Sequence, residues 1–402
     1  MLLRAFATIP DFINSLIGTS IPRFPINTYG FFVALGFIIA AYFSTKELKR
    51  KEGIGLLKGI EKKETIGSKA NVLDLLIPLL IGGFFGLKIG GVFDNGLALI
   101  TCQQQALSYL FSLDGNMIFA IIFGLAYAIF TYWDINRKSL ENPITKKIIL
   151  RPHEQIGTLV MVAAITGVLG SNIFDMFQPG NEVQNIFKDP TVLFSGLSIY
   201  GGLFFGAIGV VLFAKRAKMG PLILIDAIAA PYALASGIGR LGCHFSGDGD
   251  WGIANLSKAP SWIPEYFWSN TYAYNVINEG KEITDCTAQN ISGCGGDYCY
   301  ELTTGVWPTS IYEFIMFVII FIFTWSIRKK FSFAPGFLIF VVLLLNGVER
   351  FFIETIRVTK RYESFFNLTQ AQIISIALIV GSLAGMAYLW NKHKEDIKKT
   401  SF

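Results

Sequence analysis

Long apolar runs separated by charged loops are the feature that most constrains this chain. The nine runs lie near residues 28–45, 72–93, 117–133, 156–176, 196–214, 221–243, 309–327, 333–349 and 371–390. A helix of roughly 17–25 apolar residues is long enough to cross a bilayer. Only 16% of the 402 residues are charged, against about 25% in a soluble domain. The sequence therefore predicts an all-α polytopic integral membrane protein with about nine transmembrane helices.

The distribution of Lys and Arg predicts how these helices are oriented. Of the 34 basic residues, 23 fall in the loops 46–69, 134–155, 215–218 and 328–330 and in the tail after 390. Basic residues collect in cytoplasmic loops, so the N-terminus is expected outside and the C-terminus in the cytoplasm. The net charge of +5 then reflects topology, and no nucleic-acid partner is expected.

The spans are expected to form a single membrane domain over residues 1–402. The polar segment 253–306 is too long for a simple connection and is predicted to be an extracytoplasmic loop insertion. It either covers a site, binds a partner or has no chemical role. Four cysteines fall outside in this topology, either in disulfides or as free thiols, namely Cys102, Cys286, Cys294 and Cys299. No metal site is expected, because none of the three His lies at ligand spacing near them.

A short pattern occurs in two spans. Gly, Phe and Asp coincide at the same spacing in the segments 86–94 and 167–175. Either the chain contains an internal duplication, or small residues at helical spacing let membrane helices approach closely. The packing interpretation is favoured.

Ionisable residues in or beside a span are functional candidates, because a central Arg or Asp costs roughly 2.5–3.5 kcal/mol on insertion scales. Here Asp226 and Arg240 lie in the sixth span and Glu313 opens the seventh. After the eighth, Arg350, Glu354 and Arg357 follow at spacings of four and three, which places them on one face if the segment is helical. Two arginines flanking a glutamate suit a phosphate, and the lipid headgroup is the phosphate at that depth. The alternative is a pair of snorkelling arginines.

Two segments indicate a cavity near the outer surface. In GIGRLGCHFSGDGDWG, residues 237–252, Arg240 is followed by glycines and two carboxylates. Pro231 and Gly237 predict a broken helix before it, and irregular backbone at this depth is tolerated only in a cavity or buried in protein. Tyr200 precedes Gly201 and Gly202, which leave room for a ligand near backbone N–H groups; alternatively, Tyr200 is simply a buried, hydrogen-bonded tyrosine.

These motifs together resemble a known family. The segment GIGRLGCHFSGDGDWG is similar to the GRxGNFxNxE signature of prolipoprotein diacylglyceryl transferases, which is followed by Trp-Gly. Further matches come in the family's order and cover most of the chain: Asn27–Gly30, Tyr200–Gly202, Asp226 with Ala230 and Pro231, Trp307–Glu313, Asn346–Arg357, and Gln372 with Ser375.

The resemblance implies an activity and a location. Such enzymes move the diacylglyceryl group of phosphatidylglycerol to the lipobox cysteine of preprolipoproteins and release glycerol phosphate, the first step of bacterial lipoprotein maturation. They need no cofactor and no metal. They lie in the bacterial cytoplasmic (inner) membrane, with the active site toward the extracytoplasmic face. The family core has seven spans, so the region 94–155 is expected to contain an inserted helix pair.

The resemblance also implies residue roles. Arg240 and Arg350 are expected to bind the phosphate and stabilise its growing charge, and Tyr200 completes the catalytic set. The substrate-binding set is expected to include Arg240, Tyr29, Gly201, Gly202, Asp226, Cys243, Ser246, Asp248, Asp250, Tyr312, Glu313, Glu354 and Arg357.

The chain departs from the family pattern at several of these positions. Tyr200 replaces the histidine proposed as base, and a tyrosine pKa is normally near 10. Either Tyr200 orients the substrate, or no side-chain base is needed there. Cys243 replaces the signature asparagine, and Trp307 a second histidine. One extra residue leaves Asp248 and Asp250 as alternatives for the signature glutamate.

Two other functions are possible for a polytopic chain. A lipid or small-molecule transporter would show two comparable halves with paired discontinuous helices, and here only the pattern at 86–94 and 167–175 hints at that. A structural scaffold would not need arginines near both its sixth and eighth spans. The transferase is therefore favoured.

Overall fold

The computed structural model describes residues 5–21, 26–96, 109, 112, 114–176, 198–284, 298–359, 361–362 and 366–393. The α-helices within these residues are α1 (Ile9–Ile17), α2 (Thr28–Gly53), α3 (Val72–Asn95), α6 (Met117–Arg137), α7 (Ile156–Met176), α8 (Ile199–Arg216), α9 (Pro221–Ser246), α10 (Thr309–Ile327), α11 (Phe337–Ile353) and α12 (Gln370–Lys392). The short elements are the strands β1 (Ile60–Ile66), β2 (Ile144–Leu150), β3 (Lys281–Glu282), β4 (Tyr300–Glu301), β5 (Arg361–Tyr362) and β6 (Leu368–Thr369) and the 3-10 helices η1 (Pro152–Gln155), η4 (Glu265–Phe267) and η5 (Glu354–Ile356).

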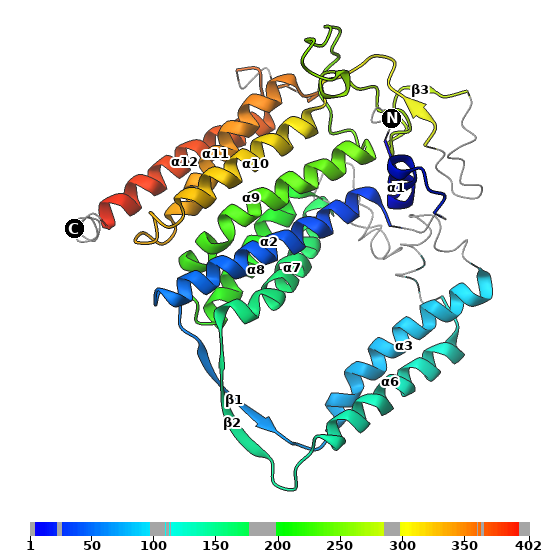
Figure 1. The fold of residues 1–402 in the computed structure, drawn as a ribbon, viewed down its shortest axis with the longest axis vertical. Coiled ribbons are helices and arrows are strands. Elements are labelled where there is room, and N and C mark those ends of the chain that lie inside the picture. The colour runs from blue at the N-terminus through cyan, green and yellow to red at the C-terminus, as the bar shows by residue number, and fades with distance from the viewer. Residues whose placement is uncertain are drawn as a thin grey trace.

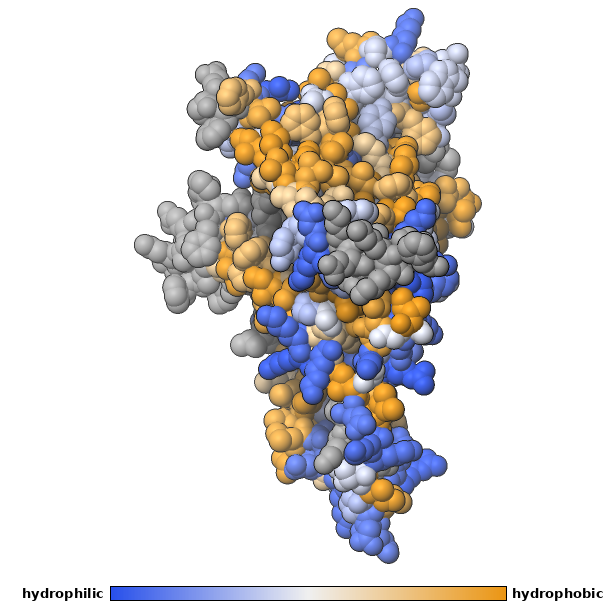
Figure 2. Space-filling view, turned by 90° about the vertical axis from the view of Figure 1, so that its left-hand side faces the viewer, coloured by the Kyte–Doolittle hydropathy of each residue, from blue (hydrophilic) through white to orange (hydrophobic). Residues whose placement is uncertain are grey.

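Each predicted apolar run coincides with one long helix. Seven helical segments in the described residues are long and apolar enough to cross a membrane, and α8 and α11, with 18 and 17 residues, are the shortest of the nine. Many large apolar side chains on these helices are exposed, among them Ile77, Ile122, Ile319 and Val380. Figure 2 shows broad hydrophobic areas on one face of the molecule. The chain is a polytopic, mainly helical membrane protein, as predicted.

Helix α9 lies in the middle of the main bundle and packs against α2 and α10 (Figure 1). The predicted break in this helix is wrong, because α9 runs unbroken through Pro231. The glycines serve close packing instead. A Cβ on Gly237 would lie 2.8 Å from Phe317 Cβ, and one on Gly242 would lie 3.2 Å from Tyr29 Cα. Small residues thus bring α9 against both neighbours.

The end of the bundle away from Arg240 is held by buried charges. The Asp226 carboxylate accepts hydrogen bonds from Gly336 N (2.7 Å) and Ile339 N (3.0 Å), at the start of α11. The Glu47 carboxylate accepts from Arg50 of the same helix and from Arg328 Nε (2.9 Å), just after α10. These contacts fix α2, α9, α10 and α11 relative to one another.

The described residues of the segment 253–306, which are 253–284 and 298–306, lie at the opposite end of the bundle, where Arg240 lies. Ile253 N donates to Ile356 O (2.8 Å), which joins this segment to the residues after α11. Its small core contains Val306 and Tyr272, together with Trp251, which precedes the segment by two residues. The ring centroids of Tyr272 and Trp251 lie 5.0 Å apart. Cys299 is disulfide-bonded. Cys102, Cys286 and Cys294 lie outside the described residues.

Helices α3 and α6 form a separate hairpin, joined to the bundle by the β1–β2 ribbon (Figure 1). The strands pair antiparallel from Ile60 with Leu150 to Ile66 with Ile144. Within the described residues, α3 and α6 pack extensively on each other. The buried Lys88 Nζ donates to the carbonyls of Tyr109 (2.6 Å), Ser112 (2.7 Å) and Asp114 (2.9 Å), so its charge holds the far end of this hairpin together.

The repeated glycine pattern lies at two similar helix contacts. A Cβ added to Gly86 of α3 would approach the Phe119 carbonyl oxygen of α6, and one added to Gly167 of α7 would approach the Gly202 carbonyl oxygen of α8. The first helix of each pair also begins 12 residues after the start of the strand before it: α3 follows β1, and α7 follows β2. The glycines therefore do serve helix packing, and the matching order of strand and two helices accords with a duplication as well.

The inserted helix pair predicted in 94–155 stays a prediction. In the structure, α6 lies in that region and packs against α3, most of which precedes it.

Deleting residues 60–143 removes β1, α3 and α6 and joins Gly59 to Ile144. The remaining chain is expected to insert and to elute as a folded, monodisperse species in detergent, because the core contacts of α2, α7 and α9 remain. Deleting 144–217, which removes α7 and α8, is the control and should yield aggregate. Aggregation of both deletions would contradict the prediction.

Candidate active site

Three arginines from distant parts of the chain meet around the Glu313 carboxylate of α10. Arg350 Nη1 of α11 lies 2.8 Å from Glu313 Oε1, and Arg240 Nε of α9 lies 3.4 Å from Oε2. Arg357 Nη1 lies 3.5 Å from the same Oε2. The Glu313 side chain is only 1% exposed. One buried anion thus fixes the positions of three guanidinium groups.

A second carboxylate, Asp250, joins two of these arginines from the loop after α9. Arg240 Nη1 donates to Asp250 Oδ2, and Arg357 Nη2 donates to Asp250 Oδ1. The Asp250 backbone carbonyl accepts from the hydroxyls of Thr309 (2.9 Å) and Ser310 (2.6 Å) at the start of α10. Sequence reasoning did not select these two hydroxyls, since they bind a backbone carbonyl that lies 59 and 60 residues away in the chain.

Glu354 completes the cluster as the sequence predicts. Its Oε2 lies 3.2 Å from Arg350 Nη2 and 3.9 Å from Arg357 Nε. The helix itself ends earlier than expected, since α11 stops at Ile353, η5 follows, and Arg357 is extended. Arg357 instead forms an isolated β-bridge with Gly252. A side chain on Gly252 would meet Ile356 O at 2.6 Å, so this glycine allows the two segments to meet.

Asp248, Cys243 and Tyr29 form a group beside Arg240. Burial raises the pKa of the Asp248 carboxyl, while a hydrogen bond with the Cys243 thiol and the charge of Arg240 act in the opposite direction. Cys243 is buried and free. Tyr29, in the first turn of α2, interacts electrostatically with Cys243, Asp248 and Arg240. The two candidate aspartates therefore differ: Asp250 pairs with arginines, and Asp248 with the thiol.

One buried pair near the site was missed in the sequence. His244 Nδ1 hydrogen-bonds with the Tyr272 hydroxyl at 2.9 Å, and both side chains are nearly inaccessible. Burial raises the pKa of Tyr272 well above its usual value, so this tyrosine stays neutral. The pair fastens the segment 253–306 to the end of α9. Local sequence carries no signal for it, because the partners are 28 residues apart.

Several predicted substrate-binding residues have other contacts. Asp226 caps α11 at the far end of the bundle and does not reach the arginines. Ser246 is buried and donates to the Cys243 carbonyl at 3.3 Å. The Tyr312 hydroxyl donates to Phe267 O (2.8 Å) and so joins α10 to the segment 253–306. Gly201 and Gly202 face α7. Tyr200 lies in the first turn of α8, and its side chain is outside the described part of the structure.

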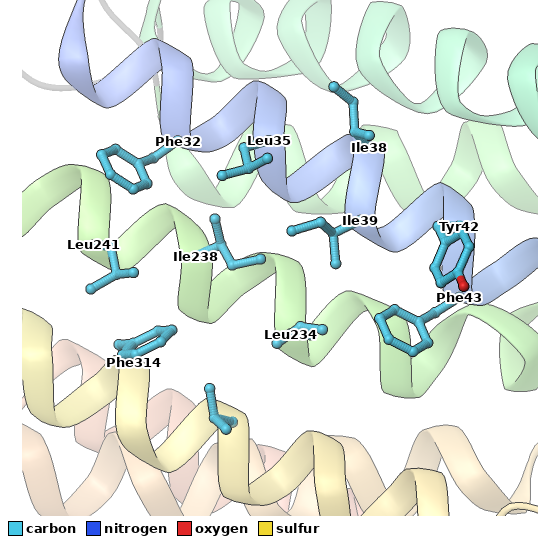
Figure 3. Close-up of a pocket in the computed structure, with 11 residues that line it drawn as sticks. Phe32, Leu35, Ile38, Ile39, Tyr42, Phe43, Leu234, Ile238, Leu241 and Phe314 are labelled. Atoms are coloured by element: carbon cyan, nitrogen blue, oxygen red, sulfur yellow. The ribbon is translucent and has the colours of Figure 1, made fainter. Parts of the chain in front are cut away.

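An apolar cleft begins next to the arginine cluster. It has a volume of about 650 Å³ and lies between α2, α9 and α10. Figure 3 shows aliphatic and aromatic side chains from the three helices pointing into it. Two lining residues, Leu241 and Phe314, directly follow Arg240 and Glu313 in the chain. The site therefore combines a cluster of cations with an adjoining surface that suits hydrocarbon.

Comparison with known proteins identifies the family. The profile of the prolipoprotein diacylglyceryl transferase family matches residues 109–388, which include all three arginines. The chain belongs to this family. It is therefore a transferase and a multi-pass membrane protein of a bacterial family. Helix α3 lies outside the matched range of the transferase profile.

Individual family members are similar over most of their length. A phosphatidylglycerol–prolipoprotein diacylglyceryl transferase of Fusobacterium nucleatum subsp. nucleatum is 28% identical over 281 residues, which cover 65% of this chain and 91% of the relative. The enzyme of the same name from Treponema denticola is 25% identical over 316 residues, 70% of this chain and 90% of the relative. That of Staphylococcus carnosus is 29% identical over 246 residues, 60% of this chain and 78% of the relative.

Replacing the central anion of the cluster should destabilise this transferase strongly. In Glu313→Ala, three arginines keep their charges but lose the carboxylate that separates them, and breaking a buried ion pair costs about 3–5 kcal/mol. The control is Thr324→Val on the same helix, where a buried hydroxyl bonds only with carbonyls of its own helix. The unfolding temperature in detergent is the measurement. Equal shifts in both variants would contradict this role of Glu313.

Proposed function

We propose that the chain transfers the diacylglyceryl group of phosphatidylglycerol to the lipobox cysteine of a preprolipoprotein. A bond forms between the cysteine sulfur and the terminal glyceryl carbon of the diacylglyceryl group. The bond from that carbon to a phosphate oxygen breaks, and glycerol phosphate leaves with the electron pair. The observation that carries the proposal is the arginine cluster, together with an apolar cleft whose lining includes the residues directly after Arg240 and Glu313.

The phosphate is proposed to bind at Arg240 and Arg350, with Arg357 beside them. Negative charge grows on the leaving phosphate as the carbon–oxygen bond breaks. Guanidinium groups already in place stabilise that charge without reorganisation. Glu313 and Glu354 contact these arginines from buried positions, so the donors are oriented before the lipid arrives.

The acyl chains are proposed to lie in the cleft between α2, α9 and α10. Its aliphatic and aromatic lining suits hydrocarbon (Figure 3). Leu241 and Phe314 begin the cleft one residue after the charged groups. A phospholipid has the same arrangement, with a phosphate at one end and apolar chains attached to it.

The thiol of the incoming lipobox cysteine must react as thiolate. Tyr200 is proposed to orient it, or to accept its proton. Tyr29, Cys243 and Asp248 lie beside Arg240 and are proposed to contact the glycerol part of the lipid headgroup.

The cluster is proposed to face the extracytoplasmic side of the bacterial inner membrane, with the C-terminus in the cytoplasm. The basic segment Lys46–Lys51 ends α2, and Lys215 and Arg216 end α8. The segment 253–306 covers the other end, where the arginines lie. A signal peptide crossing the membrane would present its lipobox at that end.

The assay uses purified protein, phosphatidylglycerol vesicles and a lipobox peptide, with mass spectrometry of the modified cysteine. Arg240→Ala and Arg350→Ala are each expected to lower turnover by about 10²- to 10³-fold, since each removes a donor to the leaving phosphate. The control is Arg328→Ala, an arginine paired with buried Glu47 at the far end of the bundle. Tyr200→Phe belongs to the same series, and an unchanged rate would show that its hydroxyl is not an essential acid or base.

Two results would overturn the assignment. Wild-type protein that modifies no cysteine, while a relative does under the same conditions, would exclude the reaction. Equal losses in Arg240→Ala and Arg328→Ala would show that the arginines act only in stability.

A bulky side chain in the cleft should discriminate between long and short acyl chains. Val318 lines the cleft and the adjacent Ile319 is exposed on another face of α10. Each excluded methylene loses about 0.8 kcal/mol of burial, so excluding two lowers kcat/KM by roughly tenfold. Val318→Trp should therefore impair dipalmitoyl phosphatidylglycerol more than the dihexanoyl lipid, and Ile319→Trp should affect neither. Equal losses on both lipids would contradict the cleft as the acyl site.

A further inference from the structure

Asp250 occupies the position between Arg240 and Arg357 that an anionic ligand would take. Its two carboxylate oxygens each accept from a different arginine. A phosphodiester presents the same features, with two non-bridging oxygens and one negative charge. The carboxylate therefore resembles, in charge and in its two acceptors, the group that the proposed function brings to this site.

The three carboxylates of the cluster differ in how firmly they are held. The Glu313 and Glu354 side chains are each 1% exposed, whereas the Asp250 side chain is 18% exposed. Glu313 projects from a helix, while Asp250 lies in a loop beside Gly249, whose φ is +92°. Its backbone carbonyl is held by Thr309 and Ser310, so rotation about the side-chain bonds is enough to move the carboxylate out.

The arginines keep their places when Asp250 leaves. Arg240 retains Glu313 at 3.4 Å, and Arg357 retains Glu313 at 3.5 Å and Glu354 at 3.9 Å. In addition, Arg357 Nε and Nη1 are buried and have no hydrogen-bond acceptor among the described residues. These two atoms therefore attract the glutamates through charge alone, and the hydrogen bond that Arg357 makes to a carboxylate is the one to Asp250.

We infer that Asp250 is an internal counter-ion that exchanges with the phosphate group of the substrate. In the empty site its carboxylate neutralises Arg240 and Arg357, and the incoming phosphate displaces it with no change in the net charge of the cluster. Asp250 thereby sets the affinity of the site for phosphate and excludes weaker anions. This inference rests on the proposed function, since it requires a phosphate at the arginines.

The test measures binding of glycerol phosphate to the full-length protein by isothermal titration calorimetry. Asp250→Asn removes the competing charge but keeps the shape of the side chain and the backbone contacts. Because a hydrogen bond to a charged group is lost only from the empty state, affinity should rise by roughly tenfold to hundredfold. Asp250→Ala, a second variant, should shift the affinity in the same direction. The matched control is Glu265→Gln, which removes one negative charge from an exposed position in η4 and should leave affinity within about twofold of the wild type.

The outcomes separate the inference from the proposed function. Unchanged or weaker binding in both Asp250 variants, while wild-type protein binds glycerol phosphate and Arg240→Ala does not, overturns the exchange but keeps the phosphate site. A similar rise in Glu265→Gln also overturns it, since the effect would then reflect net charge alone. Failure of the wild-type protein to bind glycerol phosphate or to modify a lipobox peptide overturns both.

Discussion

The buried carboxylate of Glu313 is the interaction on which the site depends. Three arginines in or beside two helices could not share one small region if their charges were uncompensated, because burying an unpaired charge is costly. Glu313 contacts all three and is 1% exposed. Glu354 and Asp250 add further negative charge from a short helix and a loop. The site is thus a balanced set of charges at the Arg240 end of α9, α10 and α11, and the lining of the apolar cleft begins with the residues directly after Arg240 and Glu313.

The fold brings these groups together through close helix contacts and two well-anchored connections. Gly237 and Gly242 let α9 pack against α10 and α2, so Arg240 reaches Glu313 across a helix interface. Gly252 allows the loop after α9 to run beside Arg357. The His244–Tyr272 pair then holds the segment 253–306 on the same end of the bundle. Gly237, which the sequence suggested as part of a helix break, is in the folded protein a point of close contact between α9 and α10.

The sequence predicts the long helices well, because a run of apolar residues in a membrane has few other stable conformations. It also indicates the charged residues of the cluster, since placing Arg240, Glu313 and Arg350 in or beside a membrane span costs free energy and so marks them as functional candidates. It does not predict which carboxylate meets which arginine. Asp226 lies on the same helix as Arg240 but about 21 Å away, given a rise of about 1.5 Å per residue, and it caps α11. Asp250 rather than Asp248 takes the arginines, a choice made by a turn with left-handed glycines that composition alone does not specify.

The β1–β2 ribbon has a consequence for how the bundle assembles. Helices α2 and α7 contact each other, although α3 and α6, among the described residues, lie between them in the chain. The cost of closing a flexible loop grows with its length, by about 0.6 kcal/mol for each doubling. Once Ile60 has paired with Leu150, the chain leaves α2 and returns to α7 at neighbouring points. The remaining connection then behaves entropically like a short loop, so the helix pair beyond the ribbon adds little to the topological difficulty of folding the core.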